Sequence, residues 1–297
     1  KVVIFSRDEL KQYELSKIFP DNIYPIRYFI GDVRDKNRLY RACSGIDFII
    51  HAAAMKRVTA SEYNPTECIA TNVIGAQNVI DASIYNKVKK VIALSTDKAA
   101  NPVNLYGATK LCSDKLFVSA NNLVGEGKTR FAVVRYGNVI SSRGSVIPLF
   151  KELLRKGAKK LPITDKRMTR FVITLDEGVN FVLNELQSFL GGEIFVPKLS
   201  SIKIIDLVEA MLKKNAYEEV GIRAGEKLHE VMIPKEESRN CIEINNKYII
   251  TPQLSWWNKT AFENKVRKNS KKVPDEFEYI SNKNKKWLSV KQLKKFL

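Results

Sequence analysis

The sequence predicts an α/β fold: a doubly wound parallel sheet with a smaller, interleaved C-terminal domain. Short apolar runs, typical of buried parallel strands, recur at residues 1–5, 47–51, 88–94 and 131–136. Helical patterns separate these runs, as they do in successive βαβ units. The 297 residues suit one large α/β unit or two modest domains, and we expect a division into 1–147 and 148–297.

Composition and charge argue against several classes of protein. Hydrophobic residues make up 44% of the chain, and no apolar run approaches the ~20 residues that cross a membrane, so we expect no membrane partner. We expect no signal peptide, and the four cysteines lack disulfide or metal-ligand spacing, which indicates a cytoplasmic protein without a metal site. The net charge of +18 is spread out and no nucleic-acid motif accompanies it, so we expect no nucleic-acid partner.

Two short strands open the chain. The first, at residues 1–5, leads through a polar Ser-Arg-Asp turn into a helix that ends near Phe19. The second, at 28–30, leads through Gly31 into a helix at 38–43. Dinucleotide-binding sheets begin instead with a strand and a glycine-rich turn that cradles the pyrophosphate. Because Gly31 is the first glycine, we expect the chain to start at the second strand of such a sheet, lacking a βα unit of ~30 residues.

The strand at 47–51 leads into a run of alanines, which let a backbone approach a ligand closely. Lys56 follows at the carboxyl edge of the sheet, and an Asn-Pro pair then begins a helix that contains Thr71 and Asn72. Asparagine is unfavourable inside a helix, so Asn72 indicates a specific contact. We expect His51 to be a satisfied residue at a strand end rather than a catalyst.

The stretch from Leu94 to Lys110 carries the densest group of reactive side chains. The strand at 88–94 is followed by Ser95, Thr96, Asp97 and Lys98. Open α/β sheets bind their ligands at such carboxyl ends of strands. The next helix, from 104 to about 121, carries Tyr106 and Lys110 four residues apart, so the two side chains share one face. An ammonium beside a phenol favours the phenolate, so we expect Lys110 to lower the pKa of Tyr106 from ~10 toward the range of a general base.

The remaining elements alternate between the sheet and a second domain. The strand at 131–136 leads into a Gly/Ser-rich loop at 137–146, and an extended segment follows at 161–165. Arg170 and Arg223 are predicted diphosphate ligands, because the planar guanidinium fork matches phosphate oxygens. Loops and a short C-terminal helix at 290–297 are expected to end the chain.

These residues resemble the extended short-chain dehydrogenase/reductases, Rossmann-type enzymes whose Ser/Thr, Tyr and Lys carry hydride chemistry on nucleotide sugars. The Thr-Asp-Lys triplet at 96–98 resembles the inverting UDP-N-acetylglucosamine 4,6-dehydratases of the pseudaminic acid pathway, which serves flagellin glycosylation. Retaining dehydratases carry Asp-Glu at the position of Asp97-Lys98, and simple 4-epimerases carry neither. The resemblance runs from Lys1 to about Ile250. It implies UDP-N-acetylglucosamine as substrate and a homo-oligomer, including hexamers.

The resemblance also implies the site residues. Catalysis is carried over onto Thr96, Asp97, Lys98, Tyr106 and Lys110. The implied cofactor contacts are Ser6, Arg7, Asp8, Glu9, Leu10, Lys11, Asp32, Val33, Ala52, Lys56, Thr71, Asn72, Tyr106, Lys110, Val139, Ile140, Ser141, Ser142 and Arg143. The implied substrate contacts are Lys56, Lys98, Asn138, Val146, Thr164, Arg170, Arg223 and Glu226.

The end of the first strand bears on the choice of cofactor. An acid there bonds the ribose 2′-hydroxyl of NAD, whereas an arginine accommodates the 2′-phosphate of NADP. Because Ser6 and Arg7 come before Asp8, the sequence favours NADP, while Asp8 also fits NAD. Ser6 and Glu9 fit a helix capping box as well.

The implied reaction assigns a proton to each group. Tyr106, as phenolate, removes the proton of the carbon-4 hydroxyl, and Thr96 or Ser95 bonds that oxygen. Neutral Lys98 takes the proton on carbon 5, and protonated Asp97 donates to the leaving carbon-6 hydroxyl. The proximity of these last two groups favours the opposite protonation states, unless burial lowers the pKa of Lys98 and raises that of Asp97.

Two other functions are compatible with the sequence. A UDP-sugar 4- or 5-epimerase of capsule synthesis uses the same tyrosine and lysine. A non-catalytic module that senses a nucleotide sugar or NADP fits the absence of a glycine-rich turn before Gly31.

Overall fold

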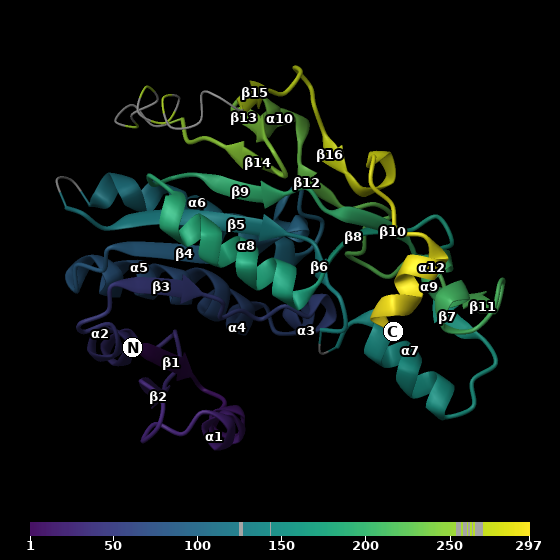
Figure 1. The fold of residues 1–297 in the computed structure, drawn as a ribbon, viewed down its shortest axis with the longest axis horizontal. Helices are drawn as coiled ribbons and strands as arrows, with labels where there is room; N and C mark the ends of the chain where they lie inside the picture. Colours follow the sequence, from purple (N-terminus) through teal and green to yellow (C-terminus); the bar gives the residue numbers. More distant parts are fainter. Residues whose placement is uncertain are drawn as a thin grey trace.

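The computed structural model describes residues 1–124, 127–142, 144–253 and 270–297, together with Trp257, Thr260, Phe262 and Asn264. Arg143, one of the expected cofactor contacts, lies outside the described residues. Within these ranges the largest sheet has seven strands, in the order β15-β13-β14-β9-β5-β4-β3 (Figure 1). Its parallel strands are β3 (Phe48–His51), β4 (Lys90–Thr96), β5 (Arg130–Tyr136) and β9 (Ile194–Pro197). An antiparallel extension consists of β14 (Lys247–Ile250), β13 (Cys241–Ile244) and β15 (Ser270–Lys272).

Helices cover both faces of the parallel strands. Successive residues of a strand point to opposite faces, so a strand buried on both sides is apolar throughout. One face packs Val91 and Val133 against α5 (Gly75–Tyr85) and α6 (Leu105–Leu123). The other packs Ile92 and Val134 against α8 (Leu175–Ser188) (Figure 1). The predicted doubly wound α/β class is therefore confirmed.

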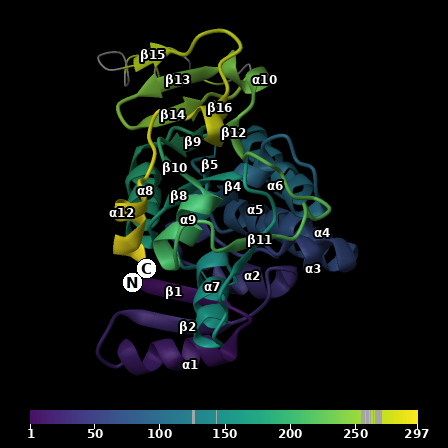
Figure 2. The same cartoon turned by 90° about the vertical axis from the view of Figure 1, so that its right-hand side faces the viewer.

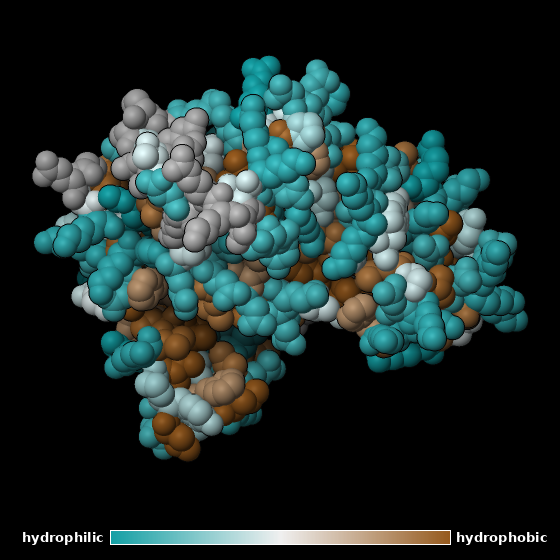
Figure 3. Space-filling view, turned by 45° about the horizontal axis from the view of Figure 1, so that its top comes forward, coloured by the Kyte–Doolittle hydropathy of each residue, from teal (hydrophilic) through white to brown (hydrophobic). Residues whose placement is uncertain are grey.

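The first two strands form a sheet of their own. β1 (Val2–Ser6) pairs in parallel with β2 (Ile26–Ile30), and α1 (Glu9–Ile18) and α2 (Lys36–Ala42) follow them. Figure 2 shows β1, β2 and α1 as a layer below the main body. Figure 3 shows apolar surface gathered over this unit and the adjoining part of the body. The N-cap of α1 is Asp8, which accepts from Lys11, so the expected cap of Ser6 with Glu9 is wrong; Ser6 accepts from the Asp8 amide instead.

The segment after β3 is more divided than predicted. α3 (Val58–Tyr63) comes before α4 (Pro65–Ile69), which begins at the predicted Asn-Pro pair. A π-helical turn, η1 (Ala70–Ile74), then joins α4 to α5. Such turns insert one residue into a helix and are frequent at functional sites. Thr71 and Asn72 both lie in this turn.

Residues beyond 148 contribute to the large sheet and to smaller ones. β6 (Asn138–Val139), β8 (Thr169–Ile173) and β10 (Ser200–Lys203) form one small sheet. β7 (Leu161–Ile163) pairs with β11 (Tyr217–Glu219), and β12 (Val231–Ile233) pairs with β16 (Tyr279–Ile280). Besides α8, the described helices here are α7 (Val146–Arg155), α9 (Ile204–Met211), α10 (Lys235–Ser238) and α12 (Val290–Leu293), with 3₁₀ turns η3 (Ser281–Lys283) and η4 (Lys294–Phe296). The division at residue 148 stays a prediction.

Candidate active site

The carboxyl end of β4 turns into a short 3₁₀ helix, η2 (Asp97–Ala99). Thr96 is extended and caps this turn, accepting from the Lys98 amide at 3.3 Å and donating to Asp97 Oδ1 at 2.9 Å. Lys98 Nζ lies 3.0 Å from the same carboxylate oxygen. Asp97 is fully buried, whereas the Lys98 side chain keeps 24% of its surface exposed. The turn therefore presents an amine and a carboxyl group as one contacting pair.

Helix α6 covers this pair with Tyr106. Its N-cap, Asn104, accepts from the Gly107 amide at 2.7 Å, so the helix starts close to η2. A Cβ atom at Gly107 would overlap the Lys98 carbonyl oxygen, so only glycine permits this approach. The Tyr106 phenol reaches the Thr96 hydroxyl and lies in the field of Lys98 and Asp97. Tyr106, Thr96, Asp97 and Lys98 thus converge on one place.

The expected lowering of the Tyr106 pKa by Lys110 is wrong for this structure. Burial raises the pKa of Tyr106 to about 12, and the opposing cation is Lys98. Lys110 donates to the Leu94 carbonyl at 2.7 Å and is itself buried, which lowers its pKa. His51 lies nearby, and burial lowers its pKa to about 3, so it is a neutral strand-end residue.

A buried ionic network lies behind Lys110. Ser95 donates to Asp114 Oδ2 at 2.8 Å, and Arg135 contacts the same oxygen at 3.4 Å. Arg135 is fully buried and also pairs with Glu237 at 2.7 Å. Because its hydroxyl is committed to Asp114, Ser95 is the weaker of the two candidates for bonding a substrate oxygen, and Thr96 is the better one.

A second buried carboxylate, Glu230, completes the group around Lys98. Glu230 Oε1 lies 3.2 Å from Lys98 Nζ and 3.6 Å from Arg170 Nε. Lys227 donates to the Ala100 carbonyl at 2.6 Å, which holds its segment against η2. Sequence reasoning missed Glu230. Its one signal is its position directly before the apolar strand β12, where a charged residue is carried into the interior.

The charges in this cluster shift one another. Burial raises the pKa of Asp97, and the nearby Lys98 offsets this only in part. Burial alone would lower the pKa of Lys98, but Asp97 and Glu230 raise it above its ordinary value. Burial would raise the pKa of Glu230, but Lys98 and Arg170 hold it below its ordinary range. The resting cluster therefore has a protonated Lys98 and an ionised Glu230.

The expected cofactor residues of the first strands lie at the ends of β1 and β2. Arg7 is exposed, and its guanidinium lies 3.4 Å from Asp32, which Arg34 also holds at 2.8 Å. Glu9, Leu10 and Lys11 form the exposed first turn of α1. The Val33 side chain differs from these, because it is buried in the hydrophobic core against Gly75.

The expected contacts after β3 lie on a segment fixed by Asn72. Its side-chain oxygen accepts from the Met55 amide at 2.8 Å, and its nitrogen donates to the Met55 carbonyl at 3.0 Å and to Thr109. Asn72 therefore positions the loop that carries the exposed Ala52 and Lys56. Thr71 is buried, and its hydroxyl has no hydrogen-bond partner among the described residues.

The loop after β5 leaves a second polar group without a partner. Asn138 Oδ1 is buried and, within the described part of the chain, accepts no hydrogen bond. Val139 and Ile140 follow in half-buried positions, and Ser141 adopts a left-handed φ of 60°. Ser142 donates its amide to Val139, and Val146 begins α7.

The expected diphosphate ligands reach the site from two directions. Arg170 comes from β8 and donates to the Thr169 and Leu228 carbonyls, at 2.8 and 3.1 Å. Arg223 is exposed and lies 3.9 Å from Glu226 on a segment that Asn104 holds, by donating to the Gly225 carbonyl at 2.7 Å. This bond places the segment beside the start of α6. Thr164 directly follows β7 and is half-buried.

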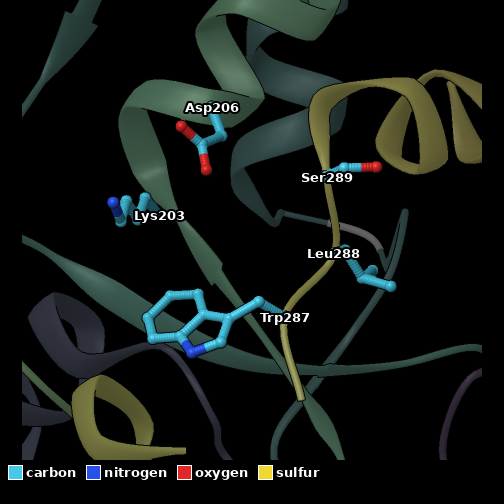
Figure 4. Close-up of a pocket in the computed structure, with 5 residues that line it drawn as sticks. All are labelled: Lys203, Asp206, Trp287, Leu288 and Ser289. Atoms are coloured by element: carbon cyan, nitrogen blue, oxygen red, sulfur yellow. The ribbon is translucent and has the colours of Figure 1, made fainter. Parts of the chain in front are cut away.

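A pocket of about 470 Å³ lies elsewhere, lined by Lys203, Asp206, Trp287, Leu288 and Ser289 (Figure 4). It contains no residue of the Lys98 cluster, and the Trp287 indole already donates to the Asn284 carbonyl at 2.7 Å. The active-site assignment therefore rests on the cluster. In the ranges that the structure describes, no helix is long and apolar enough to span a membrane, and no group of three acidic, Cys or His side chains fits a metal ion.

The parallel sheet, the Tyr-x-x-x-Lys helix and the threonine at the end of β4 define an extended short-chain dehydrogenase/reductase. The chain belongs to the polysaccharide biosynthesis protein family, whose sequence model matches residues 1–252.

Three relatives place the chain more closely. It is 57% identical over 295 residues to the UDP-N-acetylglucosamine 4,6-dehydratase (inverting) of Campylobacter jejuni, covering 99% of this chain and 88% of that protein. It is 39% identical to the UDP-glucose 4-epimerase of Rickettsia akari, covering 100% of this chain and 86% of the relative. The X-ray structure of Pen from Bacillus thuringiensis superposes with a TM-score of 0.88 at 38% identity, covering 99% and 87% of the two chains.

The contact between Gly107 and the Lys98 carbonyl yields a prediction about stability. Gly107→Ala forces α6 away from η2, and overpacking of this kind costs about 1–3 kcal/mol. Urea unfolding measures the loss. The matched control is Gly178→Ala in α8, where the added Cβ would meet its nearest atom, on Ile173, at 3.8 Å. Equal stability of the two variants would contradict the close approach.

Proposed function

We propose that the protein is an inverting UDP-N-acetylglucosamine 4,6-dehydratase that uses NADP. Its product is a UDP-4-keto-6-deoxy-L-sugar, UDP-2-acetamido-2,6-dideoxy-β-L-arabino-hex-4-ulose. The observation that carries the proposal is the Asp97–Lys98 pair at 3.0 Å, set beside Tyr106 and Thr96. The 57% identity to the Campylobacter jejuni protein of that name supports it.

The reaction needs one acid and two bases in sequence. Tyr106 takes the proton of the carbon-4 hydroxyl, while Thr96 holds that oxygen. The ketone formed at carbon 4 acidifies the neighbouring proton on carbon 5, which Lys98 removes. Asp97 protonates the carbon-6 hydroxyl, which leaves as water. A 4-epimerase needs only the first of these steps, so it has no use for an acid–base pair beside the tyrosine.

The protonation of Asp97 suits its role. Burial raises the pKa of its carboxyl group against the opposing charge of Lys98, which favours the proton that Asp97 must donate. Tyr106 needs a cation to become a phenolate, because burial raises its pKa to about 12. Lys98 is the cation that opposes this rise, and the amine of Lys110 lies on the same helix.

Two exposed cations and one buried hydroxyl without a partner in the described chain support NADP as the cofactor. When bound, NADP would supply the hydride chemistry at carbons 4 and 6. Arg7, exposed at the end of β1, would hold the 2′-phosphate, and Lys11 lies on the adjoining helix turn. The Thr71 hydroxyl, which has no hydrogen-bond partner in the described chain, would be a further contact to the cofactor. The other cofactor contacts that the resemblance implies, at the ends of β1 and β2 and in the loop after β5, are proposed together with Arg7, Lys11 and Thr71.

The substrate contacts are proposed from their charge and placement. Arg170 and Arg223 would clamp the diphosphate, and Glu226, with its buried Oε2 lacking a partner in the described chain, would accept from the nucleoside. Asn138 offers a free carbonyl oxygen to the same ligand. We place the protein in the cytoplasm as a homo-oligomer, in the pseudaminic acid pathway that serves flagellin glycosylation.

Proton NMR in deuterated water tests the activity. With UDP-N-acetylglucosamine and NADP⁺, we expect loss of water, a 4-keto-6-deoxy sugar of L configuration and one deuterium at carbon 5. A sugar that keeps its carbon-6 hydroxyl and is epimerised would make the protein an epimerase, the activity named for the Rickettsia akari relative. Absence of both turnover and cofactor binding would favour the sensing module.

Lys98 is predicted to act after the hydride step. Lys98→Met removes the base for carbon 5, so dehydration falls by about 10²- to 10⁴-fold. Oxidation at carbon 4 is slowed less, because in that step Lys98 only assists the ionisation of Tyr106, so reduced cofactor accumulates in single-turnover absorbance. The control is Lys115→Met, an exposed lysine on α6 that leaves both steps intact. Unchanged dehydration by Lys98→Met would refute the assigned role.

Arg7 is predicted to select NADP over NAD. Arg7→Ala removes a charged hydrogen bond to the 2′-phosphate, so NADPH affinity falls roughly 10- to 100-fold while NADH affinity is unchanged. Fluorescence titration with both cofactors measures the ratio. Arg27→Ala, which removes the same charge from exposed β2, is the control. If the ratio of NADPH affinity to NADH affinity is the same in Arg7→Ala as in the wild type, another residue selects the cofactor.

A further inference from the structure

Glu230 contacts Lys98 from a different part of the fold than Asp97. Lys98 Nζ lies 3.0 Å from Asp97 Oδ1 and 3.2 Å from Glu230 Oε1, so the ammonium bridges two carboxylates. The Glu230 backbone is fixed on both sides by η3, since its amide donates to Ser281 Oγ and its carbonyl accepts from the Ser281 amide, each at 2.9 Å. Glu230 is 2% exposed. The carboxylate is therefore held rigidly against Lys98.

The charged groups around Glu230 come from three parts of the chain. Asp97 and Lys98 belong to η2, Arg170 to β8 and Lys227 to the segment before β12. His229 is turned toward Thr169, at 2.8 Å. Glu230 Oε1 is shared by Lys98 and Arg170, but Oε2 is buried and has no partner in the described chain. Burial of this carboxylate favours a proton on it, and the charges of Lys98 and Arg170 oppose that proton while Lys98 is an ammonium.

The proposed reaction requires an acceptor for a proton of Lys98. Lys98 rests as an ammonium, but only an amine can take the proton of carbon 5. The proton must pass to a group in direct contact, and among the described residues Lys98 has ion pairs with Asp97 and Glu230. Asp97 must itself carry a proton to donate to the carbon-6 hydroxyl. Glu230 is the carboxylate that remains.

We propose that Glu230 is a positioning residue that accepts the proton of the Lys98 ammonium and so makes Lys98 the base for carbon 5. This inference rests on the proposed dehydratase function. An N–H bond of Lys98 breaks, an O–H bond forms on Glu230, and the electron pair stays on nitrogen. Lys98 then takes the carbon-5 proton, and Asp97 gives its own proton to the carbon-6 hydroxyl, which departs as water.

The protons balance over one turnover. After water leaves, Glu230 is protonated and Asp97 is ionised, so transfer of one proton from Glu230 to Asp97 restores both groups. Tyr106 gains one proton from the carbon-4 hydroxyl, and carbon 5 gains one after hydride return, so passing the first to carbon 5 restores the phenolate. The cluster therefore exchanges no net proton with solvent while Lys98 becomes a base.

This internal transfer has a signature in the pH profile. In the wild type the proton of the Lys98 ammonium passes to Glu230 and stays inside the site. Carbon-5 deprotonation therefore does not require Lys98 to lose a proton to solvent. In Glu230→Gln, Lys98 must release the proton to solvent, so the rate rises about tenfold for each unit of pH below the Lys98 pKa. The ratio of variant to wild-type rate then climbs with pH, from a loss of about 10²- to 10³-fold near neutrality.

The experiment measures carbon-5 deuterium incorporation and water loss across pH for four proteins. These are the wild type, Glu230→Gln, Glu230→Asp and Glu185→Gln. Glu230→Asp keeps a carboxylate and restores a ratio that is independent of pH. Glu185→Gln is the matched control, because Glu185 is 3% exposed and pairs with Lys247 at 2.7 Å, away from the cluster. Reduced cofactor accumulates in Glu230→Gln, because oxidation at carbon 4 comes first.

Each outcome decides the inference. A variant-to-wild-type ratio that climbs with pH in Glu230→Gln, and not in Glu185→Gln, supports it. A loss of equal size at every pH would assign Glu230 a structural role only, and an undiminished rate would assign it none, so either overturns the inference. Failure of the wild type to release water would overturn the proposed function, and this inference with it. If the wild type releases water but the ratio of the Glu230→Gln rate to the wild-type rate does not change with pH, the inference is overturned and the proposed function stands.

Discussion

The structure depends on the ion pairs of one lysine, Lys98, with two buried carboxylates. Burying a charge is expensive unless it is paired and hydrogen-bonded. Lys98 lies within 3.0 and 3.2 Å of Asp97 and Glu230, and Arg170 adds a second cation 3.6 Å from Glu230. The same contacts set the protonation states from which the chemistry must start. Any substitution in this group changes stability and reactivity together.

The fold supplies this cluster from segments that are far apart in sequence. β4 and η2 carry the Asp97–Lys98 pair, β8 carries Arg170, and the segment before β12 carries Glu230. Gly107 lets α6 approach closely enough to add Tyr106. Behind it, the buried pairs of Arg135 with Asp114 and Glu237 tie α6 and β5 to α10. The site is thus braced on the side away from solvent.

Sequence reasoning succeeded where the signal was local. Apolar runs predicted the strands, and a spacing of four residues put Tyr106 and Lys110 on one helix. It failed where tertiary contacts decide. The backbone of Glu230 is held by Ser281, far along the chain, and no local spacing encodes its contact with Lys98. The pKa of Tyr106 follows from burial rather than from the adjacent Lys110. The π-helical turn at Thr71 follows from packing against α6 and has no local pattern of its own.

The central claim is that an acid–base pair and a phenol act on one hexose ring. A crystal structure with NADP and UDP-N-acetylglucosamine bound tests it most directly. We expect Tyr106 at the carbon-4 hydroxyl and Lys98 Nζ about 3–3.5 Å from carbon 5, with Asp97 next to the carbon-6 hydroxyl. A hexose bound with carbons 5 and 6 turned away from the Asp97–Lys98 pair would contradict it.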